Sequence, residues 1–213
     1  MSVAENLQRV RERIARTGRD PKEITIVAVT KGFGPDACRE AIAAGLKVLG
    51  ENRVHEALTK IDEVEGAEWH LIGHLQTNKV RLITGRFALI QSVDSIRLGE
   101  LLARNNPRQQ VLVEVNASRE PQKSGVAPDD AVAAAKEIAR LLDLQGFMTM
   151  GPAHGDPRAA FTEMSTLRTT AEQGLGRALP ILSMGMSGDF EAALASGSTM
   201  LRLGQVLFGP RPA

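Results

Sequence analysis

The sequence alternates short apolar runs with longer amphipathic stretches, and this alternation restricts the possible fold more than any other feature. The apolar runs have the length of buried strands and cover residues 24–30, 47–50, 68–72, 89–93, 110–116, 146–150, 181–184, and 200–203 with 206–208. The helical stretches cover residues 3–16, 35–44, 54–64, 77–83, 96–105, 128–142, 158–173 and 190–196. Strands and helices that alternate through short connections are typical of βα units around a parallel sheet.

About eight such units, preceded by one extra helix, predict a (β/α)8 TIM barrel of the α/β class. An open, doubly wound sheet is the alternative, because periodicity alone does not separate the two. No linker or low-complexity tract interrupts the chain, so we expect one domain over residues 1–213. The chain ends soon after its last strand without a long final helix, and the amino-terminal helix is available to cover part of that gap.

Composition and charge exclude several classes of function. The chain has 26 basic and 25 acidic residues, so neither nucleic acid nor a membrane surface is expected as a partner. The single cysteine, Cys38, excludes an internal disulfide and fits a reducing compartment. No signal peptide and no stretch of roughly 18 to 20 apolar residues is apparent. We therefore expect a soluble, cytoplasmic protein that acts as a monomer.

Lys31 is the first candidate for chemistry. It closes a β-branched run and is followed at once by Gly32, in the position where parallel α/β proteins place catalytic residues. Many lysines at strand ends are simply solvated. An amine nucleophile has to be neutral, and lysine, with a reference pKa of about 10.4, needs burial or a neighbouring cation to be neutral near pH 7.

The last two loops suggest a phosphate site. Residues 183–189 offer small side chains, the Ser187 hydroxyl and backbone amides directly before a helix, and Gly204 and Gln205 follow the next strand. An ordinary turn with Ser187 as helix cap is the alternative. A lysine beside a phosphate site indicates a phosphorylated aldehyde, for which pyridoxal 5'-phosphate is the obvious example. Arg202 would lie at the same end of the barrel, unless it makes a structural ion pair.

Arg202 also bears on reactivity. Arginine stays protonated, so beside the pyridine nitrogen it would keep that nitrogen unprotonated and make the ring a weaker electron sink.

A metal site is not expected. His70 and His74 lie on a strand and its loop and do not share one helix face, which argues against metal binding.

Six blocks, in this order, resemble the pyridoxal phosphate homeostasis protein family. They are VAVTK (27–31), GENR (50–53), WHLIGHLQTNK (69–79), KSG (123–125), SMGMSGD (183–189) and RLG (202–204). The resemblance implies a fold-type III barrel, related to the barrel domain of alanine racemase, that holds pyridoxal 5'-phosphate as an imine on Lys31. It also implies phosphate contacts from Ser187 and Gly204, a pyridine-nitrogen contact from Arg202, and Asn52 beside the cofactor.

Two positions depart from the family pattern. Gln205 stands where the family usually has threonine or serine, so a hydroxyl contact to phosphate becomes an amide or backbone contact. The turn at residues 32–34 is more apolar and richer in glycine than the common version. Neither difference removes the expected cofactor.

The resemblance implies a role in intracellular pyridoxal phosphate (vitamin B6) homeostasis without strong turnover, with pyridoxal phosphate-dependent apoenzymes as possible recipients. The alternative is an amino-acid racemase acting on the external aldimine, which needs an acid or base on each face of the ring. In alanine racemase a tyrosine opposes the lysine, whereas this chain has no tyrosine and leaves no room for the β-rich domain that supplies it. A Schiff-base aldolase acting on a phosphosugar is a third, weaker possibility.

Overall fold

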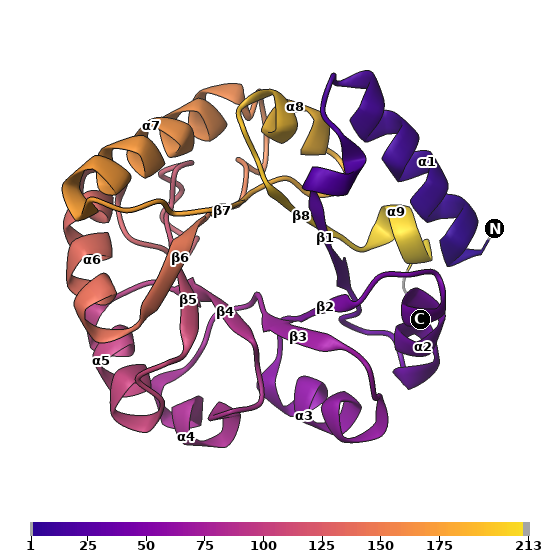
Figure 1. Ribbon diagram of the computed structural model, residues 1–213, viewed down its shortest axis with the longest axis horizontal. Coiled ribbons are helices and arrows are strands. Elements are labelled where there is room, and N and C mark those ends of the chain that lie inside the picture. The colour runs from indigo at the N-terminus through magenta and orange to yellow at the C-terminus, as the bar shows by residue number, and fades with distance from the viewer. Residues whose placement is uncertain (1, 211–213) are drawn as a thin grey trace.

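Eight parallel strands form a closed barrel in the computed structural model, which describes residues 2–210 (Figure 1). The strand order follows the chain, and β8 pairs with β1 to close the ring. The strands are β1 (Thr25–Val29), β2 (Val48–Glu51), β3 (Glu68–Leu71), β4 (Leu89–Val93), β5 (Gln110–Glu114), β6 (Asp143–Met148), β7 (Ile181–Ser183) and β8 (Met200–Leu203). The predicted (β/α)8 barrel is confirmed, and closure excludes the open sheet.

Helices surround the barrel in the predicted order. They are α1 (Val3–Arg16), α2 (Pro35–Ala43), α3 (Val54–Glu63), α4 (Val80–Ile83), α5 (Ile96–Asn105), α6 (Pro128–Leu141), α7 (Arg158–Leu175), α8 (Phe190–Ala195) and α9 (Gln205–Phe208), with 3₁₀ turns η1 (Pro21–Glu23) and η2 (Thr77–Lys79). The helix predicted over residues 77–83 is therefore η2 followed by α4. Helix α7 runs two residues past its predicted end and stops at Gly176, which has the left-handed φ of 65° common after helices.

Two strand predictions differ from the structure. Residues 206–208 were expected to extend the last strand, but they form part of the single helical turn α9. Since β8 already pairs with β1, the closed barrel offers no free edge for a further strand. Strand β6 begins at Asp143, three residues before the predicted start, because Asp143 pairs in register with Gln110 of β5.

Helix α1 occupies the place that a long final helix would otherwise cover. It lies beside the short α9 (Figure 1), where Asn6 Nδ2 donates a hydrogen bond to the Leu207 carbonyl oxygen at 2.8 Å. Its other edge meets α8 through an ion pair of 2.6 Å between Arg13 and Glu191. Four residues at helical spacing form its buried face: Val3, Leu7, Val10 and Ile14. The amino-terminal helix therefore packs against α9 and α8, on the side where the sequence left room for it.

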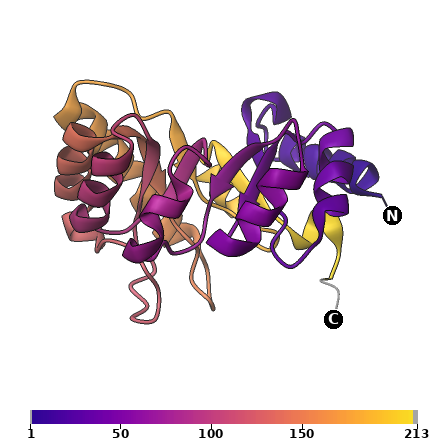
Figure 2. The ribbon, with the colours of Figure 1, turned by 90° about the horizontal axis from the view of Figure 1, so that it is seen from below.

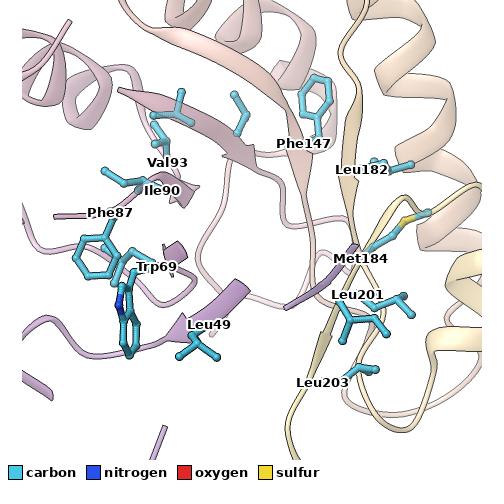
Figure 3. Packing of buried hydrophobic residues seen from close by; sticks show 14 of the residues in the cluster. Leu49, Trp69, Phe87, Ile90, Val93, Phe147, Leu182, Met184, Leu201 and Leu203 are labelled. Atoms are coloured by element: carbon cyan, nitrogen blue, oxygen red, sulfur yellow. The ribbon is translucent and has the colours of Figure 1, made fainter. Parts of the chain in front are cut away.

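Successive strand side chains face opposite sides of the barrel wall, and each side has its own core. Outward-facing residues such as Leu49, Trp69 and Phe147 pack beneath the helices (Figure 3). A smaller cluster fills the inside of the barrel and consists of Val27, Leu89, Leu112, Met148 and Met200. Because the interior is packed, ligands are restricted to the open end, where the strands finish.

The β–α loops gather at that open end, which we call the mouth. Figure 2 shows two loops projecting from the barrel on the side where the C-terminus lies, and these connect β5 to α6 and β6 to α7. They are tied together by Lys123, whose Nζ donates to the Gly151 carbonyl oxygen at 2.7 Å.

None of the helices within residues 2–210 combines the length and the apolar character that crossing a membrane requires.

Candidate functional site

Lys31 lies in a tight turn immediately after β1. The backbone N–H of Phe33 donates to the Thr30 carbonyl oxygen at 3.0 Å, which closes a four-residue turn with Lys31 in its second position. Gly32 takes the third position with a φ of 77°, a value that a side chain would strain. The glycine after the lysine is therefore a requirement of the turn that points Lys31 to the mouth.

Three charged residues hold this turn from below, and we call them the Lys60 cluster: Glu51, Glu56 and Lys60. Lys60 Nζ donates to Glu51 Oε1 at 2.6 Å and to Glu56 Oε1 at 2.8 Å. Its third bond, of 2.8 Å, reaches the carbonyl oxygen of Thr30. Glu56 Oε1 in turn accepts the backbone N–H of Gly32 at 2.6 Å. The cluster therefore binds the backbone on both sides of Lys31.

The Lys60 cluster is buried, with Glu51 fully covered and Lys60 only 4% exposed. Burial alone would lower the pKa of Lys60, but its hydrogen bonds to the two carboxylates outweigh this effect and raise that pKa. Lys60 therefore stays cationic. Glu51 Oε2 has no hydrogen-bond partner among the described residues, so the cluster carries a desolvated carboxylate oxygen close to the site.

All six residues expected to contact a cofactor line one cavity of about 290 Å³ at the mouth. They are Lys31, Asn52, Ser187, Arg202, Gly204 and Gln205. Apolar side chains that include Ile72 and Met150 form the rest of its wall. Residues up to 174 positions apart in sequence thus meet around a volume at the small end of the range for ligand pockets, about 300–1,000 Å³.

Arg202 forms the floor of this cavity and is only 5% exposed. Its Nη1 donates to the carbonyl oxygen and to Oγ of Ser183 at 2.8 and 2.7 Å, and its Nη2 donates to the Thr149 carbonyl oxygen at 2.7 Å. Burial lowers the pKa of Arg202 to about 10, and the charges of Glu114 and Asp189 oppose that shift. The guanidinium is still protonated at neutral pH, and it forms no ion pair within 4.0 Å with any residue of the range 2–210.

The two loops expected to hold phosphate meet at Ser187, whose Oγ accepts the backbone N–H of Val206 at 3.3 Å. The residue at the N-cap position of α8 is Asp189, so the alternative of Ser187 as the helix cap is wrong. Asp189 Oδ1 instead accepts the N–H of Met186 at 2.6 Å and fixes the start of the loop. The backbone N–H groups of Ser187 and Gly188 make no hydrogen bond within residues 2–210 and remain available to an anion.

Asn52 adds a polar atom to which none of residues 2–210 forms a hydrogen bond. Its Oδ1 is buried and has no hydrogen-bond partner among the described residues. Buried polar atoms without partners are rare in folded proteins because each costs roughly 1–3 kcal/mol. Since Asn52 lines the cavity beside Lys31, its Oδ1 can accept a hydrogen bond from a ligand bound there.

Glu114, a buried acid at the mouth, was not singled out from the sequence. Glu114 is 4% exposed and lies two residues after Leu112, so it points into the barrel mouth. Burial and the nearby Asp94 raise the pKa of Glu114 to about 7, although Arg202 and His74 pull it down. The expected strand ran to residue 116, which hid this position. A lone carboxylate inside the run Val111–Val115 was the available signal.

The two histidines considered for a metal have separate partners. His74 Nδ1 lies 2.9 Å from Asp94 Oδ2 at the mouth. His70 is buried inside the barrel between Glu68 and Gln91. Within residues 2–210, no three histidine, cysteine or acidic side chains come together in a group able to hold a metal ion.

Comparison with known proteins matches almost the whole chain. The family model for the alanine racemase N-terminal domain matches residues 2–212. The chain is 39% identical over 226 residues to the pyridoxal phosphate homeostasis protein of Aquifex aeolicus (strain VF5), with 99% of each chain covered. It is 40% identical over 228 residues to the protein of the same name from Escherichia coli (strain K12), with 98% of this chain and 97% of the relative covered.

Solved structures agree with this match. PipY of Synechococcus elongatus PCC7942 without pyridoxal phosphate superposes with a TM-score of 0.88 at 34% identity, covering 98% of this chain and 100% of PipY. PipY with pyridoxal phosphate bound gives 0.84 at 32% identity and the same coverage. Alanine racemase from Corynebacterium glutamicum gives 0.79 at 15% identity over 99% of this chain and 61% of the racemase, which concerns the fold alone. The chain therefore belongs to the pyridoxal phosphate homeostasis protein family, whose barrel is that of the alanine racemase N-terminal domain.

Proposed function

We propose that this protein binds pyridoxal 5'-phosphate at the barrel mouth as an imine on Lys31 and serves intracellular cofactor homeostasis. The observation that carries the proposal is the convergence of Lys31, Arg202 and the Ser187 loop on one cavity. The two PipY structures and the names of the bacterial relatives support the same cofactor.

The groups lining the cavity fit the three polar parts of this cofactor. The phosphate suits the Ser187 hydroxyl and the backbone N–H groups of Ser187 and Gly188, which have no partner among residues 2–210. The backbone of Gly204 and the side-chain amide of Gln205 complete this part of the cavity. Lys31 is held by its turn at the side of the cavity, where it suits the aldehyde carbon, and Arg202 can donate to the ring nitrogen. Asn52 Oδ1 is a further acceptor beside Lys31.

Bound pyridoxal phosphate supplies a reactive aldehyde and an electron-withdrawing ring. The residues of this chain favour binding of the cofactor over catalysis with it. Arg202 stays protonated, so it keeps the ring nitrogen in its accepting, unprotonated form and weakens the ring as an electron sink. A racemase would also need a second acid or base opposite Lys31, and the chain contains no tyrosine.

Delivery of the cofactor to pyridoxal phosphate-dependent apoenzymes is the finer part of the proposal, together with action as a cytoplasmic, single-domain monomer. The position of Met186 supports delivery, because this apolar side chain lines the cavity and is still 38% exposed. An exposed apolar residue at the rim is suited to a transient contact with a recipient.

Two measurements test the proposal. The purified protein is incubated with pyridoxal phosphate and desalted, and we expect close to one cofactor retained per chain. The loaded protein is then incubated with a panel of L-amino acids in deuterium oxide, with an alanine racemase as positive control. We expect α-proton exchange to be slow. Failure to retain the cofactor would reject binding, and rapid exchange would favour the racemase alternative.

A further inference from the structure

A continuous line of hydrogen bonds crosses the inside of the barrel from Arg202 to the amino end of β3. Arg202 Nη1 donates to Ser183 Oγ at 2.7 Å, and Ser183 Oγ donates to Gln91 Oε1 at 2.7 Å. Gln91 Nε2 lies 3.0 Å from His70 Nδ1, and His70 Nε2 lies 2.9 Å from Glu68 Oε1. The first four residues are at most 5% exposed, whereas the Glu68 side chain is 55% exposed at the far end of the barrel.

The chemistry of the two ends sets one direction for these bonds. A guanidinium only donates and a carboxylate only accepts, so Ser183 Oγ accepts from Arg202 and His70 Nε2 donates to Glu68. His70 Nδ1 is then the acceptor, and the Gln91 amide group faces it. If the Gln91 amide were rotated by 180°, its oxygen would face the Met200 sulfur, which Gln91 Nε2 now contacts at 3.2 Å. The rotated amide oxygen would also require a proton on His70 Nδ1, so both nitrogens of His70 would then carry protons.

These contacts leave part of Arg202 free for the cavity. Both protons of Nη1 are used on Ser183, and one proton of Nη2 is used on the Thr149 carbonyl oxygen. The N–H of Nε and the second proton of Nη2 make no hydrogen bond within the described part of the chain. Since Arg202 lines the cavity, these two N–H groups are the donors available to a bound ring nitrogen.

We propose that Ser183, Gln91 and His70, ending on Glu68, are positioning residues that fix Arg202 so that its two remaining donors face the cofactor. The inference rests on the proposed function. It assigns a role to a surface carboxylate at the opposite end of the barrel from the cofactor. Because each bond polarises the next, loss of the last acceptor is expected to loosen the first donor.

The direction of the bonds is tested on the ligand-free protein. Long-range ¹H–¹⁵N NMR of the histidine side chains, assigned with a His70→Gln variant, reports which ring nitrogen carries the proton. We expect a single tautomer for His70 at pH 7, with the proton on Nε2. A proton on Nδ1, or on both nitrogens, would overturn the proposal.

Positioning of Arg202 is tested by two matched pairs of variants, with the dissociation constant for pyridoxal phosphate as readout. Ser183→Ala removes a hydroxyl of the line, whereas Ser198→Ala removes an equally buried hydroxyl that bonds only the carbonyl oxygens of Leu182, Met184 and Met200. We expect about tenfold weaker binding for Ser183→Ala and a change below twofold for Ser198→Ala.

The second pair of variants changes Glu68, at the exposed end of the line, where a substitution disturbs the folded structure least. Glu68→Leu removes the final acceptor, whereas Glu68→Gln keeps an oxygen that accepts from His70. We expect weaker binding, about threefold, for Glu68→Leu only. If the wild type binds the cofactor and both pairs show no difference, the positioning role is wrong while the proposed function stands. If the wild type does not bind, the proposed function is wrong, and the tautomer still tests the hydrogen-bonded line.

Discussion

Lys60 Nζ donates a hydrogen bond of 2.8 Å to the carbonyl oxygen of Thr30, the residue immediately before Lys31. The backbone that carries the proposed nucleophile is thus held by a second, buried lysine. That second lysine is neutralised by Glu51 and Glu56, and Glu56 also binds the residue after Lys31. The position of Lys31 is therefore coupled to a buried cluster of charges.

Replacing Lys60 by methionine tests this coupling. The change leaves the Glu51 carboxylate buried without its counter-charge, so we expect a loss of about 3 to 5 kcal/mol in the free energy of unfolding. Urea denaturation followed by circular dichroism measures it. Lys47→Met, at an exposed position, serves as control and should change stability by less than about 0.5 kcal/mol.

The double variant Glu51→Gln with Lys60→Met removes the orphaned charge together with its partner. We expect it to regain part of the lost stability, since replacing both members of a buried pair costs less than replacing one. Equal stability of Lys60→Met and the wild type would contradict the burial of a charged cluster.

Glu114 gives the ligand-free protein a predictable dependence on pH. Its pKa is about 7 in the folded state, against an ordinary value of 4.5, so the folded protein binds a proton between these values that the unfolded chain releases. The contribution of Glu114 to the free energy of unfolding therefore falls by about 3 kcal/mol as the pH rises from about 4.5 to 7. Above pH 7 it stays level.

Glu114→Gln removes that dependence. We expect the variant to be more stable than the wild type by about 3 kcal/mol above pH 7 and nearly equal below pH 4.5. Denaturant titrations at a series of pH values measure the difference, with the exposed Glu65→Gln as control. Parallel pH profiles for Glu114→Gln and the wild type would contradict a raised pKa at this position.

Ser187→Ala tests the phosphate assignment. It removes one phosphate donor and the acceptor of the Val206 N–H, while Lys31 is untouched. We expect about tenfold weaker retention of pyridoxal phosphate, in line with the loss of one hydrogen bond to a charged group, and an unchanged absorbance spectrum of the bound fraction. Ser196→Ala, beyond the far end of α8, is the control. Equal retention by the two variants would reject a phosphate contact from Ser187.

The sequence predicted the barrel, and it brought the six candidate residues to one end of it, because both inferences depend on local signals. Strand ends can be located from apolar runs, and a parallel barrel brings those ends to one side. Lys31 was visible because a β-branched run stops there and a glycine turn begins. Ser187 and Arg202 were visible because they lie at or just after the ends of the last two apolar runs, and the family resemblance then implied which part of the cofactor each would contact.

The supporting residues were hidden because their partners are distant or their pattern is misleading. Glu56 and Lys60 are four residues apart on α3, a spacing typical of solvated ion pairs, and only the packing of α3 against the turn buries Lys60. Ser183 and Gln91 are 92 positions apart, and only barrel closure brings them together. Residues 206–208 read as a strand because an apolar run of three does not distinguish a strand from a helical turn.

The most direct test of the account is the identity of the residue that forms the imine. The protein is loaded with pyridoxal phosphate, reduced with borohydride and digested, and the modified peptide is identified by mass spectrometry beside the absorbance spectra of wild type and Lys31→Ala. We predict an imine absorbance band that borohydride abolishes, a single adduct on Lys31, and no such band in Lys31→Ala. An adduct on another lysine, or an imine band that persists in Lys31→Ala, would contradict the account.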